Sequence, residues 1–255
     1  MQFTDTHTHL YDEAFIGDIG KVLGRATEAG VSKMILPDID SLSRGSMFNL
    51  ADSYPGILFP CLGVHPTSVN KNWKDEISRM EAHLSRKIYA IGEVGIDCHW
   101  SVEHLEEQIK TFRYMLETAH RLSLPVIIHS RESTEVIIKV LKEYKHLNLR
   151  GVFHAYSGSI ETFRQIQSTG EWYIGIGGVL TFKKASIAET VKNIPLERIL
   201  LETDSPYLTP VPYRGQRNES AYIPLIASVL AELKGVDITE VAEKTTDNAE
   251  KLFGI

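Results

Sequence analysis

The stretch LEEQIKTFRYMLETAHRLSLPVIIHSR, residues 105–131, holds a helical pattern followed at once by a strand pattern. Its apolar side chains recur at the spacing of one helix face, which predicts an amphipathic helix over residues 105–122. These side chains are Ile109, Phe112, Met115, Leu116 and Ala119. Pro125 then precedes an apolar, β-branched run, and because proline cannot continue a helix, it favours a helix end followed by strand entry.

The same alternation of helix and strand patterns runs along the whole chain. Short apolar runs predict eight strands, at residues 3–6, 31–36, 58–64, 88–93, 126–129, 151–154, 173–177 and 199–204. Helical patterns lie between them, and residues 221–255 are predicted to form closing helices. Parallel strands joined by crossover helices produce this order, so we predict an α/β fold, the (β/α)8 TIM barrel. The alternative is an open doubly wound sheet, but that fold usually has a glycine-rich loop after its first strand, where this chain has histidines.

Length and composition set limits on the class of protein. The chain has 255 residues, 43% of them hydrophobic and 24% charged, and barrels of about 250 residues form single domains. We therefore predict one domain over residues 1–255. The net charge of −6 argues against a protein that coats duplex nucleic acid by neutralising many phosphates. A nuclease remains possible, because metal cations can neutralise one scissile phosphate locally.

Cysteine content and the N-terminal segment bear on location. Cys61 and Cys98 are the only cysteines, too few for a disulfide framework, which suits a reducing compartment. The N-terminus has neither a basic n-region nor an apolar h-region, and no apolar run approaches the roughly 18 residues of a membrane span. We expect a cytoplasmic protein without membrane association or an obligate protein partner.

Potential metal ligands stand at the predicted strand ends. The first strand runs into DTHTHL, where the period-two geometry of a strand puts His7 and His9 on the same side of the chain. Later strands end in further imidazoles and carboxylates, namely Glu93, His129, His154 and Asp204. Each alone is more often a buried hydrogen-bonded histidine or a helix-capping carboxylate. Together they match what two divalent cations need at the end of a barrel where catalytic groups lie, with Glu93 able to bridge them.

The ordered motifs DTHTHL, GVHP, IGEVGID, PVIIHSR, GVFHAYSG, GGVLTFKKA, LLETDSPYLTP and RGQRNE span nearly the whole chain. In them the chain resembles the TatD family of metal-dependent deoxyribonucleases, which are amidohydrolase-like barrels. The resemblance implies that His7, His9 and Asp204 hold one metal, that His129 and His154 hold the other, and that Glu93 is shared. It also implies 3′-to-5′ exonuclease action on single-stranded DNA or frayed 3′ ends. The ligand types leave zinc, magnesium, manganese and iron open.

Several residues are candidates for substrate contacts. His65 ends the third strand, where the resemblance implies a role near substrate, although a structural hydrogen bond is the alternative. The cations of Arg131, Lys183 and Arg214 are candidates for phosphate or carboxylate binding, and Lys184 and Arg217 share those late loops; the alternative for the loop residues is solvation.

The chain departs from the family pattern in places. Thr67 stands where the family often has a second histidine, and Cys98 and His99 stand where it often has aromatic residues. We expect Cys98 to line the fourth loop as a thiol rather than to bind zinc. The remaining histidines lie on helical segments and are predicted to be on the surface: His83, His104, His120 and His146.

The predicted chemistry is in-line attack of water on phosphorus. Metal coordination lowers the pKa of water from about 16 toward about 7, which makes it a nucleophile at neutral pH. Asp204 is the predicted base that takes or orients the proton, and Glu93 is the second predicted catalytic residue.

Two other interpretations stay open. The same site could hydrolyse an ester or an amide, including the aminoacyl ester of D-aminoacyl-tRNA. A carboxylate-binding pocket near Arg131 would favour that substrate, whereas paired Lys and Arg loops favour a phosphodiester. In a non-enzymatic interpretation the ions only staple the barrel, but structural zinc sites are usually closed by four ligands that commonly include cysteines.

Overall fold

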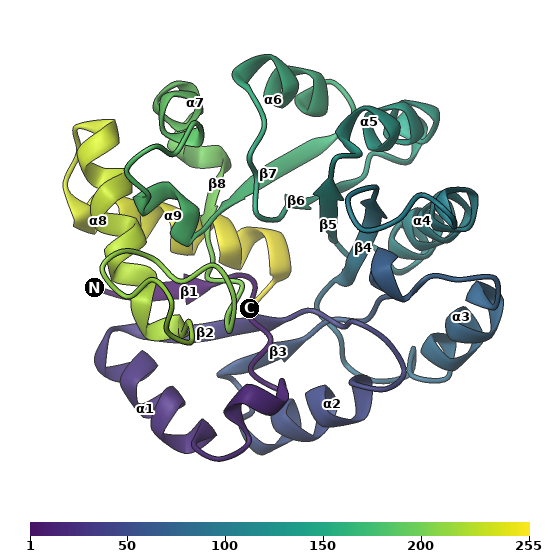
Figure 1. Cartoon of the computed structure of the whole chain (residues 1–255), viewed down its shortest axis with the longest axis horizontal. Helices are drawn as coiled ribbons and strands as arrows, with labels where there is room; N and C mark the ends of the chain where they lie inside the picture. Colours follow the sequence, from purple (N-terminus) through teal and green to yellow (C-terminus); the bar gives the residue numbers. More distant parts are fainter.

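The structure is a computed structural model that describes residues 1–255, in which eight parallel strands form a (β/α)8 barrel (Figure 1). Most of the strands consist largely of buried apolar residues, as parallel strands covered on both faces require. The strands are β1 (Phe3–Asp5), β2 (Val31–Leu36), β3 (Leu58–Pro60), β4 (Ile91–Asp97), β5 (Val126–Arg131), β6 (Arg150–Phe153), β7 (Glu171–Ile176) and β8 (Ile199–Leu201).

Hydrogen bonds join the strands in chain order and carry the sheet around the barrel. Strands β1 to β3 pair in sequence, and so do β4 to β8. Between β3 and β4, Leu62 N–H donates to Ala90 O over 3.1 Å, and Gly92 N–H donates to Leu62 O over 3.0 Å. Between β1 and β8, Thr6 N–H donates to Leu201 O over 3.0 Å. The open doubly wound alternative is therefore wrong.

A helix follows each strand and covers the outside of the barrel (Figure 1). These helices are α1 (Ile19–Glu28), α2 (Arg44–Ser53), α3 (Trp73–Glu81), α4 (Leu105–Leu122), α5 (Thr134–Glu143), α6 (Ile160–Gln167), α7 (Ile187–Asn193) and α8 (Ile223–Lys234). The helix predicted from the opening stretch has the bounds of α4. No helix is long and apolar enough to cross a membrane.

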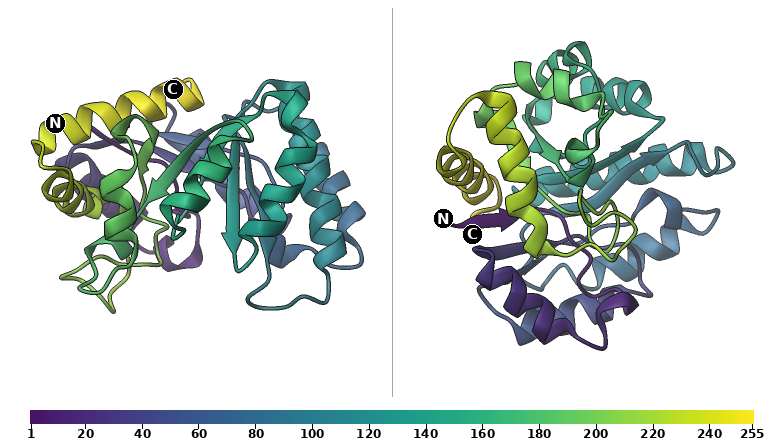
Figure 2. Two further views of the ribbon diagram at one scale, coloured as in Figure 1. Left: turned by 90° about the horizontal axis from the view of Figure 1, so that it is seen from above. Right: turned by 60° about the vertical axis from the view of Figure 1, so that its left-hand side comes forward.

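A ninth helix, α9 (Ile238–Phe253), lies across one end of the barrel (Figure 2, left). Inward-facing residues of six strands form a small apolar cluster there, which includes Ile35, Ile127 and Leu200, and the last turns of α9 close it with Leu252 and Phe253. The larger apolar cluster, with 53 buried residues, packs the helices against the outside of the strands. The end opposite α9 is left for the functional groups.

All eight strands occur where they were predicted, but the fourth is displaced. The prediction of 88–93 ended at Glu93, whereas β4 runs from Ile91 to Asp97. Gly95 explains the difference, because a Cβ there would lie 2.0 Å from His129 O, so glycine is what lets β4 lie against β5. The third and eighth strands end earlier than predicted, since the chain beyond them forms only isolated bridges, Leu62 with Ile91 and Thr8 with Ser205.

Candidate metal centre

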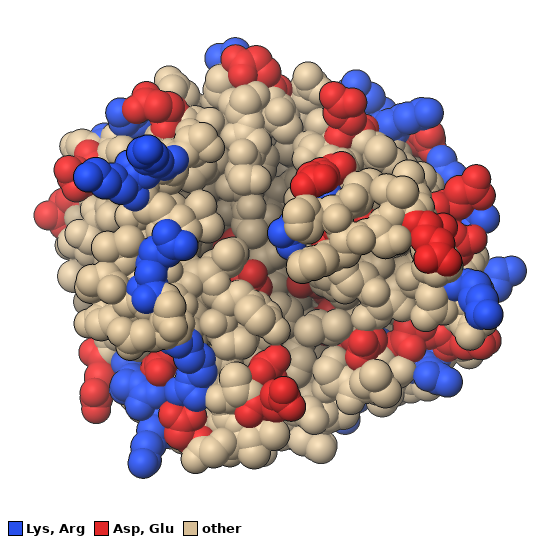
Figure 3. All heavy atoms as spheres, in the orientation of Figure 1, with Lys and Arg blue, Asp and Glu red and all other residues tan.

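A pocket of about 700 Å³ opens at the carboxyl ends of the strands. In Figure 3 it is the hollow at the centre of the face, with acidic side chains inside it and most Lys and Arg side chains around or beyond its rim. Its lining includes five of the six predicted ligands, His9, Glu93, His129, His154 and Asp204. His7 lies behind them and is fully buried.

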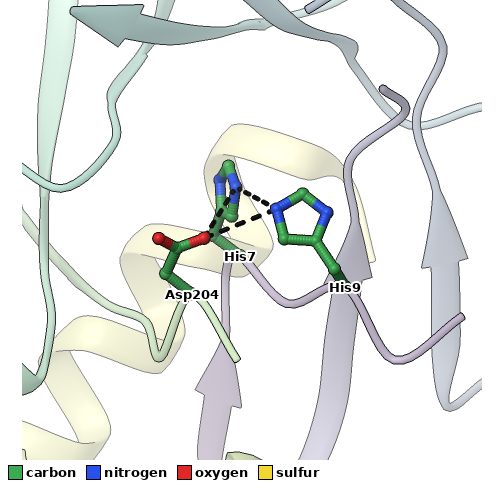
Figure 4. A group of neighbouring side chains, drawn as sticks. All are labelled: His7, His9 and Asp204. Atoms are coloured by element: carbon green, nitrogen blue, oxygen red, sulfur yellow. Dashed lines mark hydrogen bonds and ion pairs between the residues drawn. The ribbon is translucent and has the colours of Figure 1, made fainter. Parts of the chain in front are cut away.

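The first group of ligand atoms comes from the loop after β1 and the loop after β8 (Figure 4). His7 Nε2 and His9 Nε2 are 3.3 Å apart, and Asp204 Oδ1 lies 3.7 Å from the former and 3.4 Å from the latter. Asp204 adopts a left-handed backbone conformation, with φ of 57°, and its N–H donates to His7 O over 2.8 Å. That bond fixes the distance between the two loops.

Glu93 joins this group to a second one. Its Oε2 lies 3.1 Å from His7 Nε2 and 3.8 Å from His9 Nε2. Its Oε1 lies 2.8 Å from His129 Nδ1 and 3.4 Å from His154 Nε2. The two oxygens of one buried carboxylate therefore face two separate sets of imidazoles.

Neighbouring residues fix the protonation of two of these rings. The hydroxyl of Tyr11 donates to Pro37 O over 2.5 Å, so it accepts the Nδ1–H of His9 at 2.9 Å. On the other side, Asp97 Oδ2 lies 2.9 Å from His129 Nε2 and accepts its proton. In the neutral ring, each bond leaves the opposite nitrogen with a lone pair toward Glu93, as a metal ligand requires.

His65 differs from His9 and His129 in which ring nitrogen carries the proton. The backbone N–H of Thr67 donates to His65 Nδ1 over 3.2 Å, so in the neutral ring the proton lies on Nε2. That nitrogen is 3.3 Å from Glu93 Oε1 and 3.2 Å from His129 Nδ1. His65 thus presents a hydrogen-bond donor to the pocket rather than a lone pair, which agrees with a substrate-side role better than with a ligand role.

The charges in the pocket favour ionised carboxylates. Burial raises the pKa of Glu93, but the neighbouring imidazoles, among them His65 and His154, outweigh it and hold the pKa well below its usual value. Burial also raises the pKa of Asp204, but the neighbouring imidazoles of His9, His154 and His7 outweigh it, so this pKa too is lowered. Both carboxylates are therefore charged at neutral pH.

A buried polar network holds the first strand against the last. Asp5, at the end of β1, accepts Thr203 Oγ1–H over 2.6 Å and Ser220 Oγ–H over 2.7 Å. Its other oxygen accepts His7 N–H at 3.2 Å and Thr203 N–H at 3.0 Å. The network ties the His7 loop to the loop that carries Asp204.

These residues fit divalent cations. The Nε2 atoms of His7 and His9 lie 3.1 to 3.8 Å from each other and from one oxygen each of Glu93 and Asp204. Their lone pairs repel one another unless a cation or a proton lies among them. Imidazole and carboxylate donors are the set that zinc, manganese and related ions accept.

The predicted basic residues divide into two sets. Arg131 lines the pocket, and its guanidinium lies 5.2 Å from the ring centre of Trp100. Lys183 and Arg214 are exposed and do not line it; Arg214 lies over Phe182 instead, at 4.1 Å. Arg131 is therefore the only lysine or arginine in the lining.

Other side chains from the sequence analysis lie outside the pocket lining. Arg217 is held by Asp18 at 2.8 Å and by Glu219 at 3.3 Å, so it ties loops together. Burial raises the pKa of Cys98, which keeps its thiol protonated and unlike a zinc ligand. His99 pairs with Glu132, and none of the four histidines predicted to lie on the surface reaches the pocket.

Sequence reasoning missed three residues that lie beside the predicted ligands: Tyr11, Asp97 and Glu202. Asp97 could have been found from the alternation in IGEVGID, because it lies on the same face of β4 as Glu93. Glu202 stands two residues before Asp204, so the same alternation indicates it. For Tyr11, whose hydroxyl lies beside His9, no signal in the sequence was available.

Imidazole and carboxylate side chains that could hold metal ions gather at the catalytic end of a (β/α)8 barrel, which is the arrangement of a metal-dependent hydrolase. The family model described as TatD related DNase matches residues 4–254, and the chain belongs to the TatD family. The non-enzymatic interpretation, in which the ions only stabilise the fold, is therefore wrong.

Named relatives match over nearly the whole length. The uncharacterized metal-dependent hydrolase YabD of Bacillus subtilis (strain 168) is 36% identical, over 98% of each chain. The uncharacterized metal-dependent hydrolase YcfH of Escherichia coli (strain K12) is 32% identical, over 100% of this chain and 97% of its own. Among solved structures, YJJV, a TatD homolog from Escherichia coli K12, superimposes with a TM-score of 0.92 at 32% identity, over 99% of this chain and 98% of the other.

Proposed function

We propose that the protein hydrolyses phosphodiester bonds of DNA with two divalent cations, as a 3′-to-5′ exonuclease on single-stranded or frayed 3′ ends. The observation that carries the proposal is the placement of Glu93, whose two oxygens face two separate imidazole groups. The family description, TatD related DNase, supports the substrate. Both cysteines are free, which suits action in the reducing cytoplasm.

The geometry supports one division of the ligand roles. His7, His9 and Asp204 would hold one ion, His129 and His154 the other, and Glu93 would bridge them. When bound, such ions lower the pKa of water toward neutrality and offset charge on phosphate oxygens.

The chain's own groups supply the proton chemistry and the positioning. The Asp204 carboxylate is ionised and its side chain is 17% exposed, so it can take or orient a proton from water in the pocket. The Nε2–H of His65 can donate to a non-bridging oxygen of the substrate. Apolar residues on the side of β7 and the loop after it, among them Ile176, Val179 and Leu180, form a wall suited to a base or sugar.

One observation favours a second candidate, hydrolysis of an ester or amide such as the aminoacyl ester of D-aminoacyl-tRNA. Arg131 is the single cation in the lining, and the basic side chains of Lys183 and Arg214 lie outside it. One guanidinium suits one carboxylate as well as one phosphate. The metal chemistry would be the same, and only substrate contacts would differ.

Metal analysis of the purified protein, followed by assays with and without chelator, tests the proposal. We expect two equivalents of metal, chelator-sensitive shortening of 3′-labelled single-stranded oligonucleotides, and no release of amino acid from D-aminoacyl-tRNA. Cleavage of the aminoacyl ester with intact oligonucleotides would move the assignment to the second candidate.

The substitution Asp204→Asn tests the role of Asp204 as the base. The amide keeps one oxygen for the metal but cannot take a proton, so turnover should fall by about 100-fold or more. Metal content should fall much less, as measured by elemental analysis of the same preparation. If rate and metal content fall together, Asp204 is a ligand only.

A further inference from the structure

Glu202 is a buried carboxylate just beyond the end of β8, and the proposed mechanism does not use it. Its side chain is 1% exposed and lies behind the two metal groups. Its Oε1 accepts the backbone N–H of Ala155 at 2.5 Å and lies 3.4 Å from His154 Nδ1. One nitrogen of His154, one of His7 and one oxygen of Glu202 all lie within 4.8 Å of one another.

The rings of His7 and His154 lie side by side in front of this carboxylate. Their centres are 3.6 Å apart and their planes differ by 15°. The two rings belong to different proposed metal sites, because His7 Nε2 faces Glu93 Oε2 and His154 Nε2 faces Glu93 Oε1. Because Nε2 of each ring faces Glu93, Nδ1 of each ring points away from that carboxylate.

Three polar atoms in this region are buried without a hydrogen-bond partner. They are His7 Nδ1, His154 Nδ1 and Glu202 Oε2. Buried polar atoms are rarely left without partners, because burial removes the water that would otherwise bind them. Two imidazole nitrogens and a carboxylate oxygen are complementary once each nitrogen carries a proton.

We propose that Glu202 is a positioning residue shared by both metal sites, in which one carboxylate oxygen accepts the Nδ1–H of His7 and the other accepts the Nδ1–H of His154. This inference rests on the proposed ligand roles of His7 and His154. A neutral imidazole carries one proton, so fixing it on Nδ1 leaves the Nε2 lone pair directed at the metal. His9 and His129 have their own partners, Tyr11 and Asp97, and Glu202 completes the set.

A third metal ion among the same three atoms is the competing explanation. It would need lone pairs on both nitrogens of His7 and both nitrogens of His154, since their Nε2 atoms already face Glu93. Each ring would then carry no proton and a negative charge, which is unfavourable next to an ionised carboxylate. Hydrogen bonding satisfies the same atoms without that cost.

Because Glu202 would orient one histidine of each metal site, its loss has a measurable consequence. Loss of a partner that orients a metal-binding histidine typically lowers metal affinity by about 10- to 100-fold. Asp97 and Tyr11 each serve one ring, so their loss should affect one ion. Loss of Glu202 should affect both ions, because it orients one ligand of each.

Nitrogen-15 NMR of the histidine side chains in the zinc-loaded wild-type protein tests the proposal without any substitution. Long-range nitrogen–proton correlations identify which nitrogen of each ring carries the proton. We expect His7 and His154 both to be protonated at Nδ1, with these protons slow to exchange with water. Protonation at Nε2 in either ring, or a third equivalent of zinc, would overturn the proposal.

Two variants probe the role from different directions, with zinc affinity measured by chelator competition. Glu202→Gln replaces one acceptor oxygen with a donor, so one of the two rings loses its partner and at least one ion should bind about 10- to 100-fold more weakly. Gly175→Ala retains the Glu202 side chain, but its Cβ would lie 1.9 Å from Oε2, 2.4 Å from Cδ and 2.8 Å from Oε1, so the whole carboxylate must move. We expect Gly175→Ala to weaken the binding of both ions.

Glu171→Gln is the matched control. It makes the same carboxylate-to-amide change on a barrel strand, but Glu171 pairs with Arg198 at the opposite end of β7. Zinc affinity should stay at the wild-type value in this variant. If Glu202→Gln also stays there, the positioning role is wrong. Because these readouts need no substrate, a failure of the DNA assay leaves this test intact.

Discussion

At the scale of single residues, the far nitrogen of each imidazole decides what the near nitrogen can do. Asp97 accepts from His129 Nε2, so His129 Nδ1 faces Glu93 as an acceptor. Thr67 donates to His65 Nδ1, so His65 faces the same carboxylate as a donor. Two histidines within hydrogen-bond distance of one oxygen thus have opposite chemical roles.

The substitution Asp97→Ala tests this logic at His129. Without its carboxylate partner, the ring can turn or carry its proton on Nδ1, and the ion held by His129 should bind about 10- to 100-fold more weakly. Chelator competition, followed one ion at a time, measures the change. Asp52→Ala on the surface is the control, and an unchanged affinity in Asp97→Ala would show that Asp97 does not orient the ring.

The pKa of His154 leads to a pH prediction for the metal-free protein. Burial lowers this pKa, but the charges of Glu93 and Glu202 outweigh it and raise the pKa to about 10. The ring is therefore protonated at neutral pH, and a metal must displace a proton to bind its Nε2. Affinity should rise with pH through neutrality, by about tenfold per unit for one displaced proton, and stop rising above the pKa.

Isothermal titration calorimetry of zinc binding in buffers of different ionisation enthalpy measures this proton release. We expect at least one proton released per protein at pH 7. A binding enthalpy that does not depend on the buffer would contradict the protonated state of His154.

At this scale the sequence predicted which residues form the site better than it predicted which neighbours orient their side chains. The ends of strands indicated His7, His129 and Asp204, because parallel strands in a barrel bring their carboxyl ends to one rim. Residues such as Tyr11 act through contacts between segments, which a single sequence does not reveal. The exposed Lys183 shows the same limit, since a late loop can point away from the pocket.

At the scale of elements, α9 stabilises the barrel from the end opposite the site. Leu252, which is 2% exposed, packs with Phe253 against the inward-facing residues of the strands. The sequence predicted closing helices after residue 221, because apolar periodicity was present. Which end of the barrel they close depends on packing that periodicity does not encode.

The substitution Leu252→Ala should therefore lower the free energy of unfolding by about 2 to 5 kcal/mol, through lost apolar burial and a cavity. Urea denaturation measures the effect, with the exposed Lys251→Ala as control, expected to change stability by less than about 0.5 kcal/mol. Metal affinity should stay unchanged, because α9 lies away from the site. A Leu252→Ala variant as stable as Lys251→Ala would show that α9 does not close the core.

The displaced strand β4 shows where element prediction fails. The fourth strand was predicted over residues 88–93, so it ended at Glu93 within IGEVGID, and glycines usually weaken a strand pattern. In the barrel, Gly95 instead lets β4 and β5 lie close together, and the strand continues to Asp97. The contact of Gly95 with β5 therefore explains why the strand does not end at Glu93.

At the scale of the whole molecule, the sequence predicted eight strands and favoured a closed barrel, because histidines stand where an open doubly wound sheet usually has a glycine-rich loop. Eight helix-and-strand units are also compatible with an open sheet until the first strand meets the last. The structure shows that meeting in the bonds of Thr6 with Leu201 and of Asp204 with His7. The same bonds bring His7 within 3.7 Å of Asp204, so closure of the barrel also assembles the site.

Anomalous diffraction from crystals grown with zinc or manganese tests most directly whether Glu93 bridges two metal ions. We predict two peaks, one on each side of the Glu93 carboxylate, one beside His7, His9 and Asp204 and the other beside His129 and His154. A single peak, or peaks away from Glu93, would contradict the bridged pair.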